Sequence, residues 1–111
     1  MHAATLMNPY FAVIFTSKLK QPATGYAEMA AKMEQLAKQQ PGYLGIESAR
    51  DTALGITISY WASEQAIKDW KNQLEHQLAQ KLGREKWYQH YHVRVAKVER
   101  EYEFNHMDDV L

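Results

Sequence analysis

Aromatic and polar side chains gather in the second half of the chain, and these residue types have the clearest chemical use. Large rings that enclose a few polar groups are typical of a pocket for a flat, apolar ligand. The same rings also suit a hydrophobic core or a subunit interface, so both interpretations stay open. The rings belong to Tyr60, Trp61, Trp70, Trp87, Tyr88, Tyr91 and Tyr102, and the polar groups to His76, Arg84, His90, His92 and Arg94.

Metal and nucleophile chemistry have weaker support. His90 and His92 are two apart in a predicted strand and share a face, but neither a carboxylate nor a third histidine lies nearby in sequence. We therefore predict no metal site. The chain has no cysteine, which excludes disulfides, zinc–thiolate sites, iron–sulfur clusters and a cysteine nucleophile. Its serines form no Gly-x-Ser-x-Gly elbow, and its glycines match no phosphate- or dinucleotide-binding loop.

The length and charge of the chain indicate how many domains it forms and which kinds of partner it binds. The chain has 111 residues, with 13 basic and 13 acidic side chains and no formal net charge. One domain is expected, at 9–104, with tails at 1–8 and 105–111. A neutral chain lacks the basic field of a non-specific nucleic-acid binder, and the longest apolar run, 10–15, is far too short to span a membrane. The missing targeting segment and the missing cysteine favour a cytoplasmic protein.

The hydrophobic pattern predicts the elements that must position these side chains. Tyr10–Lys18 begins with six consecutive apolar residues, which is typical of a strand buried on both faces. Apolar residues then recur with helical spacing over Thr24–Gln40, and a Pro-Gly pair ends that helix. Two strands, Tyr43–Arg50 and Leu54–Trp61, follow as a predicted hairpin.

A second helix and a last strand complete the pattern. Ser63 is the predicted N-cap of a helix that ends before Gly83. A short aromatic connector, Arg84–His90, leads into a last strand, Tyr91–Tyr102. The apolar stripe of the helix comprises Ile67, Trp70, Leu74, Leu78 and Leu82.

The order β-α-β-β-α-β predicts an α+β, ferredoxin-like fold with a four-stranded antiparallel sheet. Right-handed crossovers place both helices on one face of that sheet and leave the other face bare. Because the first strand is apolar on both sides, the bare face also needs a cover. A second copy of the chain is the cover we expect, so the sequence predicts a homodimer.

The position of His76 follows from the helical wheel. With about 100° per residue, Leu74 and Leu78 lie within about 20° of Ile67, whereas His76 lies near 180° from it. In a straight helix, His76 therefore points away from the sheet. A bend near Lys71–Leu74, or a partner chain, would be needed to bring it to a pocket.

Three segments carry a resemblance to a known family. They are Pro41–Glu47 (PGYLGIE), Ile56–Trp61 (ITISYW) and Ala66–Lys71 (AIKDWK). With further matches through Arg94 and Val95, the resemblance covers about 9–104. The chain resembles the antibiotic biosynthesis monooxygenase (ABM) family. This resemblance implies a homodimeric α+β barrel in which each protomer holds a pocket between its sheet and its helices.

The resemblance also implies an activity. Some members oxidise phenol-, quinol- or anthrone-like aromatic substrates with dioxygen and without metal or flavin, so we expect a monooxygenase with no cofactor. Such chemistry needs a shaped, dry pocket and a polar group near the phenolic oxygen. On this expectation, we assign catalytic roles to His76, Trp70 and Arg84. Substrate binding is assigned to Trp61, Trp87, Tyr91 and His92.

Two alternatives remain. Other relatives bind and degrade haem through a first-strand Asn, a helix Trp and a helix His. Trp70 matches that Trp, but Phe15 falls at the Asn position and Gln80 at the His position. The second alternative is a dimer that binds a small ligand without catalysis.

Overall fold

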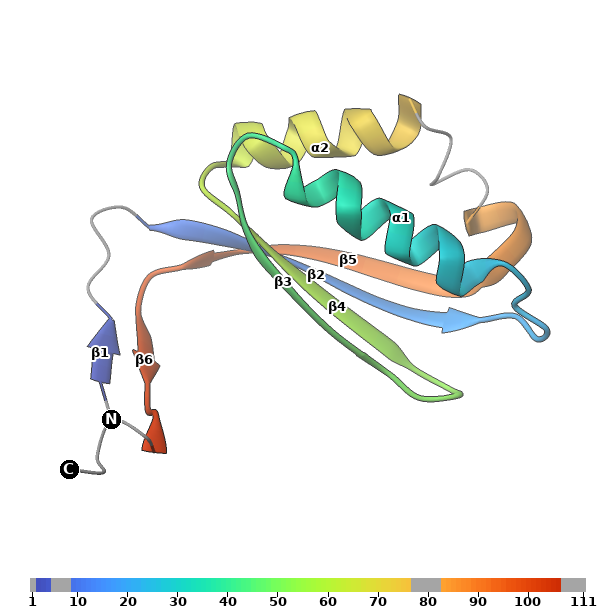
Figure 1. The fold of residues 1–111 in the computed structure, drawn as a ribbon, viewed down its shortest axis with the longest axis horizontal. Coiled ribbons are helices and arrows are strands. Elements are labelled where there is room, and N and C mark those ends of the chain that lie inside the picture. Colours follow the sequence, from blue (N-terminus) through green and yellow to red (C-terminus); the bar gives the residue numbers. More distant parts are fainter. Residues whose placement is uncertain (1, 5–8, 77–82, 107–111) are drawn as a thin grey trace.

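The computed structural model describes residues 2–4, 9–76 and 83–106. The body contains β2 (Tyr10–Leu19), α1 (Tyr26–Lys38), β3 (Tyr43–Arg50), β4 (Gly55–Trp61), α2 (Glu64–His76), the π-helical turn η1 (Gly83–Trp87) and β5 (Tyr88–Val98). The four strands form an antiparallel sheet in the order β3-β4-β2-β5. Both helices lie on the same side of this sheet (Figure 1). The predicted ferredoxin-like α+β fold is confirmed.

Strand register divides the side chains of the sheet between two faces. Trp61 is fully buried in a cluster with Ala37 of α1 and Ala66 of α2, so its side chain lies on the face that carries the helices. Phe11 pairs with Trp61 across β2 and β4. Because side chains alternate along a strand, the odd-numbered residues of β2 share this inner face, and the even-numbered residues lie on the outer face.

Gly42 explains how α2 can lie so close to the β3 end of the sheet. Its φ is +85°, a left-handed conformation that favours glycine, and a Cβ there would lie only 2.6 Å from the Cβ of Ala66. The backbone N–H of Ala62 also donates to the Gly42 carbonyl at 2.8 Å. The Pro-Gly pair predicted to end the first helix therefore also lets the second helix pack.

Hydrogen bonds between side chains and nearby backbone groups stabilise the start of α2 and the turn between β3 and β4. The Ser63 Oγ accepts a hydrogen bond from the Ala66 backbone N–H at 3.1 Å, which confirms the predicted N-cap of α2. In the hairpin turn, the Asp51 carboxylate accepts from the backbone N–H groups of Ala53 and Leu54 at 2.7 and 2.8 Å. These two bonds lower the pKa of Asp51 below its ordinary value. Leu54, predicted as the first strand residue, therefore belongs to the turn.

The last strand differs from the prediction of Tyr91–Tyr102. β5 already begins at Tyr88, because β2 continues to Leu19 and pairs with it there. The predicted connector is thus shorter and consists of η1. β5 ends at Val98, and β6 (Glu101–Glu103) pairs instead with β1 (His2–Ala4), a segment that lies within the predicted N-terminal tail. Figure 1 shows this pair standing apart from the body.

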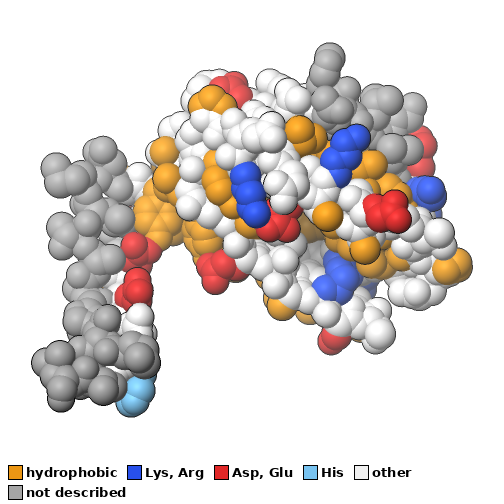
Figure 2. Space-filling view, viewed as in Figure 1, with side chains coloured by type: hydrophobic (Ala, Val, Ile, Leu, Met, Phe, Trp, Pro, Cys, Tyr) orange, Lys and Arg blue, Asp and Glu red, His pale blue; other side chains and the backbone are white. Residues whose placement is uncertain are grey.

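Among the described residues, no helix is long and apolar enough to cross a membrane. On the face drawn in Figure 2, hydrophobic, basic and acidic side chains are interspersed over the body. The predicted end of the second helix at 77–82 lies outside the described residues.

Candidate functional site

A cavity of about 580 Å³ lies between the inner face of the sheet and the two helices. Its volume falls within the range of about 300–1,000 Å³ typical of small-molecule sites. All four strands of the sheet, both helices and η1 contribute to the lining. Apolar side chains of the lining include Val13, Met29, Ala30, Met33, Ile46, Ile67, Leu74, Val93 and Val95, and its aromatic side chains are Phe15, Tyr26, Trp70, Trp87, Tyr88 and Tyr91. Polar side chains are Glu34, Ser48, Thr57, Ser59, Lys71 and Arg84.

Five aromatic rings pack together at one end of this cavity, and we call them the tyrosine cluster. Phe15 of β2 stacks on Tyr91 of β5 with 5.3 Å between ring centroids, and Tyr88 lies edge-on to both. Tyr26, the first residue of α1, lies edge-on to Tyr88 at 5.7 Å and to Trp87 at 6.1 Å. The Trp87 indole N–H donates to a backbone oxygen just before α1 at 2.8 Å, which ties η1 to that helix.

The hydroxyl groups of this cluster take part in two hydrogen bonds, in which Tyr26 and Tyr91 accept and so keep their own hydrogens. The Tyr88 hydroxyl donates to the Tyr26 hydroxyl at 3.4 Å. Burial, and then this hydrogen bond, raise the pKa of Tyr88 well above its ordinary value, so Tyr88 stays protonated at neutral pH. The Arg84 guanidinium donates to the Tyr91 hydroxyl at 3.4 Å. This end of the cavity can therefore donate hydrogen bonds to an oxygen of a ligand.

The other end of the cavity is apolar and lies against the core. Trp70 of α2 stacks on Trp61 with 5.9 Å between ring centroids and an interplanar angle of 24°. The Trp61 indole N–H donates to the Ser59 Oγ at 2.9 Å. Ile67 and Val13 pack against the same buried cluster. Trp61 thus supports the ring of Trp70 from behind.

The structure brings together some of the side chains that the sequence predicted for the site. Trp70, Arg84, Trp87 and Tyr91 line the cavity, from three different elements. Trp61 has a solvent-exposed fraction of 0% and lies in the core instead of on the cavity surface.

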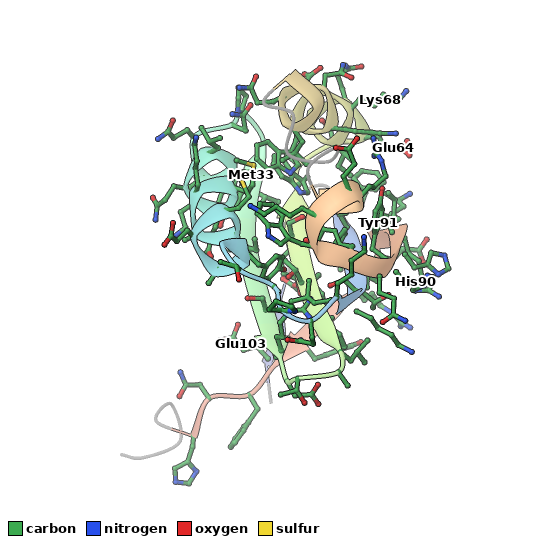
Figure 3. The ribbon with its side chains drawn as sticks, turned by 90° about the vertical axis from the view of Figure 1, so that its right-hand side faces the viewer. Met33, Glu64, Lys68, His90, Tyr91 and Glu103 are labelled. Carbon is green, nitrogen blue, oxygen red and sulfur yellow. The ribbon has the colours of Figure 1, made fainter. Side chains whose placement is uncertain are left out.

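The predicted histidines are not among the lining residues whose side chains the structure describes. His92 is an even-numbered neighbour of Tyr91 in β5, so the pleat places it on the outer face. Figure 3 shows His90, which shares that face, pointing away from the helices. His76 is the last residue of α2, and its side chain lies outside the described part of the structure. Its predicted role stays a prediction.

Several residues at this end of the cavity were not predicted as site residues from the sequence, among them Arg50 and Tyr26. The guanidinium of Arg50, at the end of β3, lies 5.3 Å from the centroid of the Tyr26 ring. Tyr26 itself occurs in a helical stripe that looks like ordinary core. No signal in the sequence brings these two together, because their contact depends on strand register and on the docking of α1.

Within the described residues, no group of three or more histidine, aspartate or glutamate side chains is placed to hold a metal ion. A metal site formed by His90 and His92 would therefore have no third such ligand among the described residues. The only carboxylate among the described lining residues is Glu34, which forms an ion pair with Lys38 at 3.6 Å.

Comparisons with known proteins agree with this architecture. The family model for antibiotic biosynthesis monooxygenase matches residues 11–82. The uncharacterized protein YqjZ of Bacillus subtilis (strain 168) is 52% identical over 94 residues, which cover 84% of this chain and 82% of that protein. The jasmonate monooxygenase ABM of Pyricularia oryzae is 30% identical over 95 residues, which cover 79% of this chain but only 43% of that protein.

Solved structures share the fold at low sequence identity. A mutant of SnoaB, a cofactor-independent oxygenase from Streptomyces nogalater, superposes with a TM-score of 0.72 at 10% identity, over 83% of this chain and 95% of that chain. The protein PA3566 from Pseudomonas aeruginosa gives a TM-score of 0.67 at 18% identity, over 91% of this chain and 100% of that chain.

Proposed function

Because this chain belongs to the antibiotic biosynthesis monooxygenase family, we propose that it oxidises a small aromatic substrate with dioxygen and without a cofactor. The substrate class is a phenol, a quinol or an anthrone-like compound. The observation that carries this proposal is the cavity of about 580 Å³, which has aromatic walls and a few polar groups gathered at one end. The fold that it shares with a cofactor-independent oxygenase supports the absence of a cofactor.

The substrate supplies the redox chemistry in this proposal. Loss of the phenolic proton gives an electron-rich anion, which passes one electron to dioxygen. The substrate radical and superoxide then recombine to a peroxide. Its collapse leaves one oxygen atom as a new carbonyl of the quinone and releases the other as water. The protein contributes shape, exclusion of water and stabilisation of the anion.

The cavity residues divide these tasks. Trp70 and Trp87 form apolar walls that hold a flat ring, and Tyr91 stacks with Phe15 at the polar end. Arg84 brings a positive charge to the Tyr91 hydroxyl, where the substrate anion would develop. The haem alternative relies on a helix His as ligand, and the position expected for it, Gln80, lies outside the described residues.

We also propose that a second copy covers the outer face of the sheet. One row across this face runs Glu47, Ile58, Ile14 and Arg94 from β3 to β5. The centre of the row is apolar, and its two edges carry opposite charges. A two-fold axis parallel to the strands would bring each Glu47 opposite Arg94 of the second copy, so the surface complements itself.

Obstruction of the cavity tests the proposed activity. The substitution Ile67→Trp fills the apolar end, so we expect it to abolish the oxidation of a quinol or anthrone in air while the protein still melts cooperatively. The exposed neighbour Lys68 gives the matched control, Lys68→Gln, which we expect to leave the rate unchanged. Equal rates in all three proteins would place any oxidation outside the cavity and contradict the proposal.

A further inference from the structure

The geometry points to an anion-binding end of the cavity, at which the Tyr26 hydroxyl donates to a negatively charged oxygen of an aromatic ligand and Arg50 positions and polarises Tyr26. The ligand class is an aromatic phenolate or carboxylate. This inference rests on the proposed function and deepens it, because it names residues that bind the charged group of the substrate.

Strand register aligns the parts of this site. Arg50 pairs with Gly55, Gly55 with Ser17, and Ser17 with Tyr91, so these four residues form one row across the inner face from β3 to β5. This row meets β2 at Ser17, whereas Val13 of the same strand packs at the apolar end of the cavity. The two residues are four apart, which corresponds to about 13 Å at 3.3 Å per residue. The charged end and the apolar end of the cavity are thus well separated.

Gly55 lets the arginine cross the sheet. A Cβ at this position would overlap the Arg50 guanidinium, so the guanidinium occupies the space that a larger side chain would need. The backbone at Gly55 is not in the left-handed region, so the glycine acts by leaving room for the Arg50 guanidinium, which a larger side chain would displace.

The guanidinium reaches two partners across that gap. It donates to the Ser17 hydroxyl, whose residue is only 1% exposed. It also lies over the Tyr26 ring at 5.3 Å from the centroid, within the range of a cation–π contact. A cation beside a phenol ring draws electron density from it, so the Tyr26 hydroxyl becomes a stronger hydrogen-bond donor.

The hydroxyl pair leaves one hydrogen for a ligand. Tyr88 donates to Tyr26, and a hydroxyl group has one hydrogen to donate in turn. No acceptor for the Tyr26 hydrogen is found among the described residues. An acceptor oxygen of a ligand beside the tyrosine cluster would take this bond.

Cationic groups beside the tyrosine cluster favour an anion there. Arg50 and Arg84 both contact tyrosines of the cluster, and Lys71 of α2 also lines the cavity. Glu34 is the lining carboxylate, and Lys38 pairs with it. The two guanidinium groups that contact Tyr26 and Tyr91 are cationic, so an anionic ligand oxygen beside these tyrosines is stabilised.

Binding of 4-nitrophenol under nitrogen tests this site without any oxidation. Its phenolate absorbs visible light, so a pH titration of the bound probe reports the pKa of the probe itself. We expect the protein to lower that pKa relative to free probe. A second arm compares the binding of 4-nitrobenzoate with that of its methyl ester. Tighter binding of the acid than of the ester would identify a site that also accepts carboxylates. A lowered pKa of bound 4-nitrophenol without that preference would identify a site for phenolates alone.

Three variants locate the effect. Tyr26→Phe and Arg50→Gln are expected to weaken binding of the anionic probe by about tenfold, as for a lost charge-assisted bond, and to raise its bound pKa toward the value of free probe. Gly55→Ala keeps Arg50 but displaces its guanidinium, so it should give the same result. The neutral probe 4-nitroanisole should bind all three variants as it binds the original protein, and Arg100→Gln, an exposed arginine outside the cavity, is the matched control.

The outcomes separate this inference from the proposed function. An unchanged probe pKa in the original protein, or full anion affinity in Arg50→Gln and Gly55→Ala, would overturn the anion site whatever the protein oxidises. Strong anion binding that depends on these residues would support the site even if no substrate is oxidised, and in that case only the proposed oxidation fails.

Discussion

At the scale of the residue, side-chain direction decides which predicted groups belong to the site. Tyr91 and His92 are adjacent in β5, and adjacent strand residues face opposite sides of a sheet. Both cannot line this cavity, although the sequence analysis assigned substrate binding to both. Trp70, Trp87 and Tyr91 line the cavity, and the roles assigned to them stay predictions. Composition did not separate them from Trp61, whose neighbours Ala37 and Ala66 bury it completely.

Trp70 and Trp61 form a stacked pair in which the two rings have different tasks. Trp70→Phe keeps most of the volume of a ring that faces the cavity, so we expect weaker ligand binding with a nearly unchanged melting temperature. Trp61→Phe removes the indole bond to Ser59 from the core, so we expect a lower melting temperature and a smaller change in ligand binding. Fluorescence titration and thermal melting measure both quantities. Loss of stability without loss of affinity in Trp70→Phe would make Trp70 a core residue.

Asp51 gives a prediction for acid pH. Hydrogen bonds from the backbone N–H groups of Leu54 and Ala53 lower the pKa of this exposed carboxyl below 3.8, its ordinary value. Its folded pKa is below its unfolded pKa, so its stabilisation is present above pH 3.8 and is lost as the pH falls through the folded pKa. Asp51→Asn should therefore destabilise the protein at pH 7 and much less at pH 2–3, measured by urea unfolding. An equal loss at both pH values would show that the charge is not involved.

At the scale of the element, helices and the hairpin were predictable because their signals are local. Caps, periodicity and turn residues lie within a few positions of one another, as at Ser63 and Asp51. The start of β5 was not predictable in this way, because Tyr88 enters the sheet only where β2 provides a partner at Leu19. The contact of Arg50 with Tyr26 depends in the same manner on register between distant segments.

The cap of α2 gives a direct test at this scale. Ser63→Ala removes the acceptor for the Ala66 N–H, and we expect it to reduce the free energy of unfolding by about 1 kcal/mol. Ser63→Asp retains an acceptor and adds a negative charge at the helix N-terminus, so its stability should stay close to that of the original protein. Urea unfolding measures both. Equal losses in the two variants would mean that the bond to Ser63 does not stabilise α2.

At the scale of the whole molecule, the apolar outer face predicts self-association. Sedimentation at micromolar concentration should give about twice the chain mass of 12.9 kDa. Ile58→Lys places a charge in the centre of the row that includes Ile14 and should give monomers. Glu47→Arg should weaken the dimer, and adding Arg94→Glu should restore it, because the proposed two-fold axis pairs these positions. A monomeric original protein, or no rescue by the double variant, would contradict the proposed packing.

The central claim is that the aromatic cavity supports oxygenation without a cofactor. The most direct measurement is the mass of the product formed from an anthrone under ¹⁸O₂ by protein that has been treated with EDTA. We expect that each product molecule gains one ¹⁸O atom, that chelator does not reduce the rate, and that Ile67→Trp abolishes the incorporation. Oxidation that stops with EDTA and returns with one added metal, or product that carries no ¹⁸O, would contradict it.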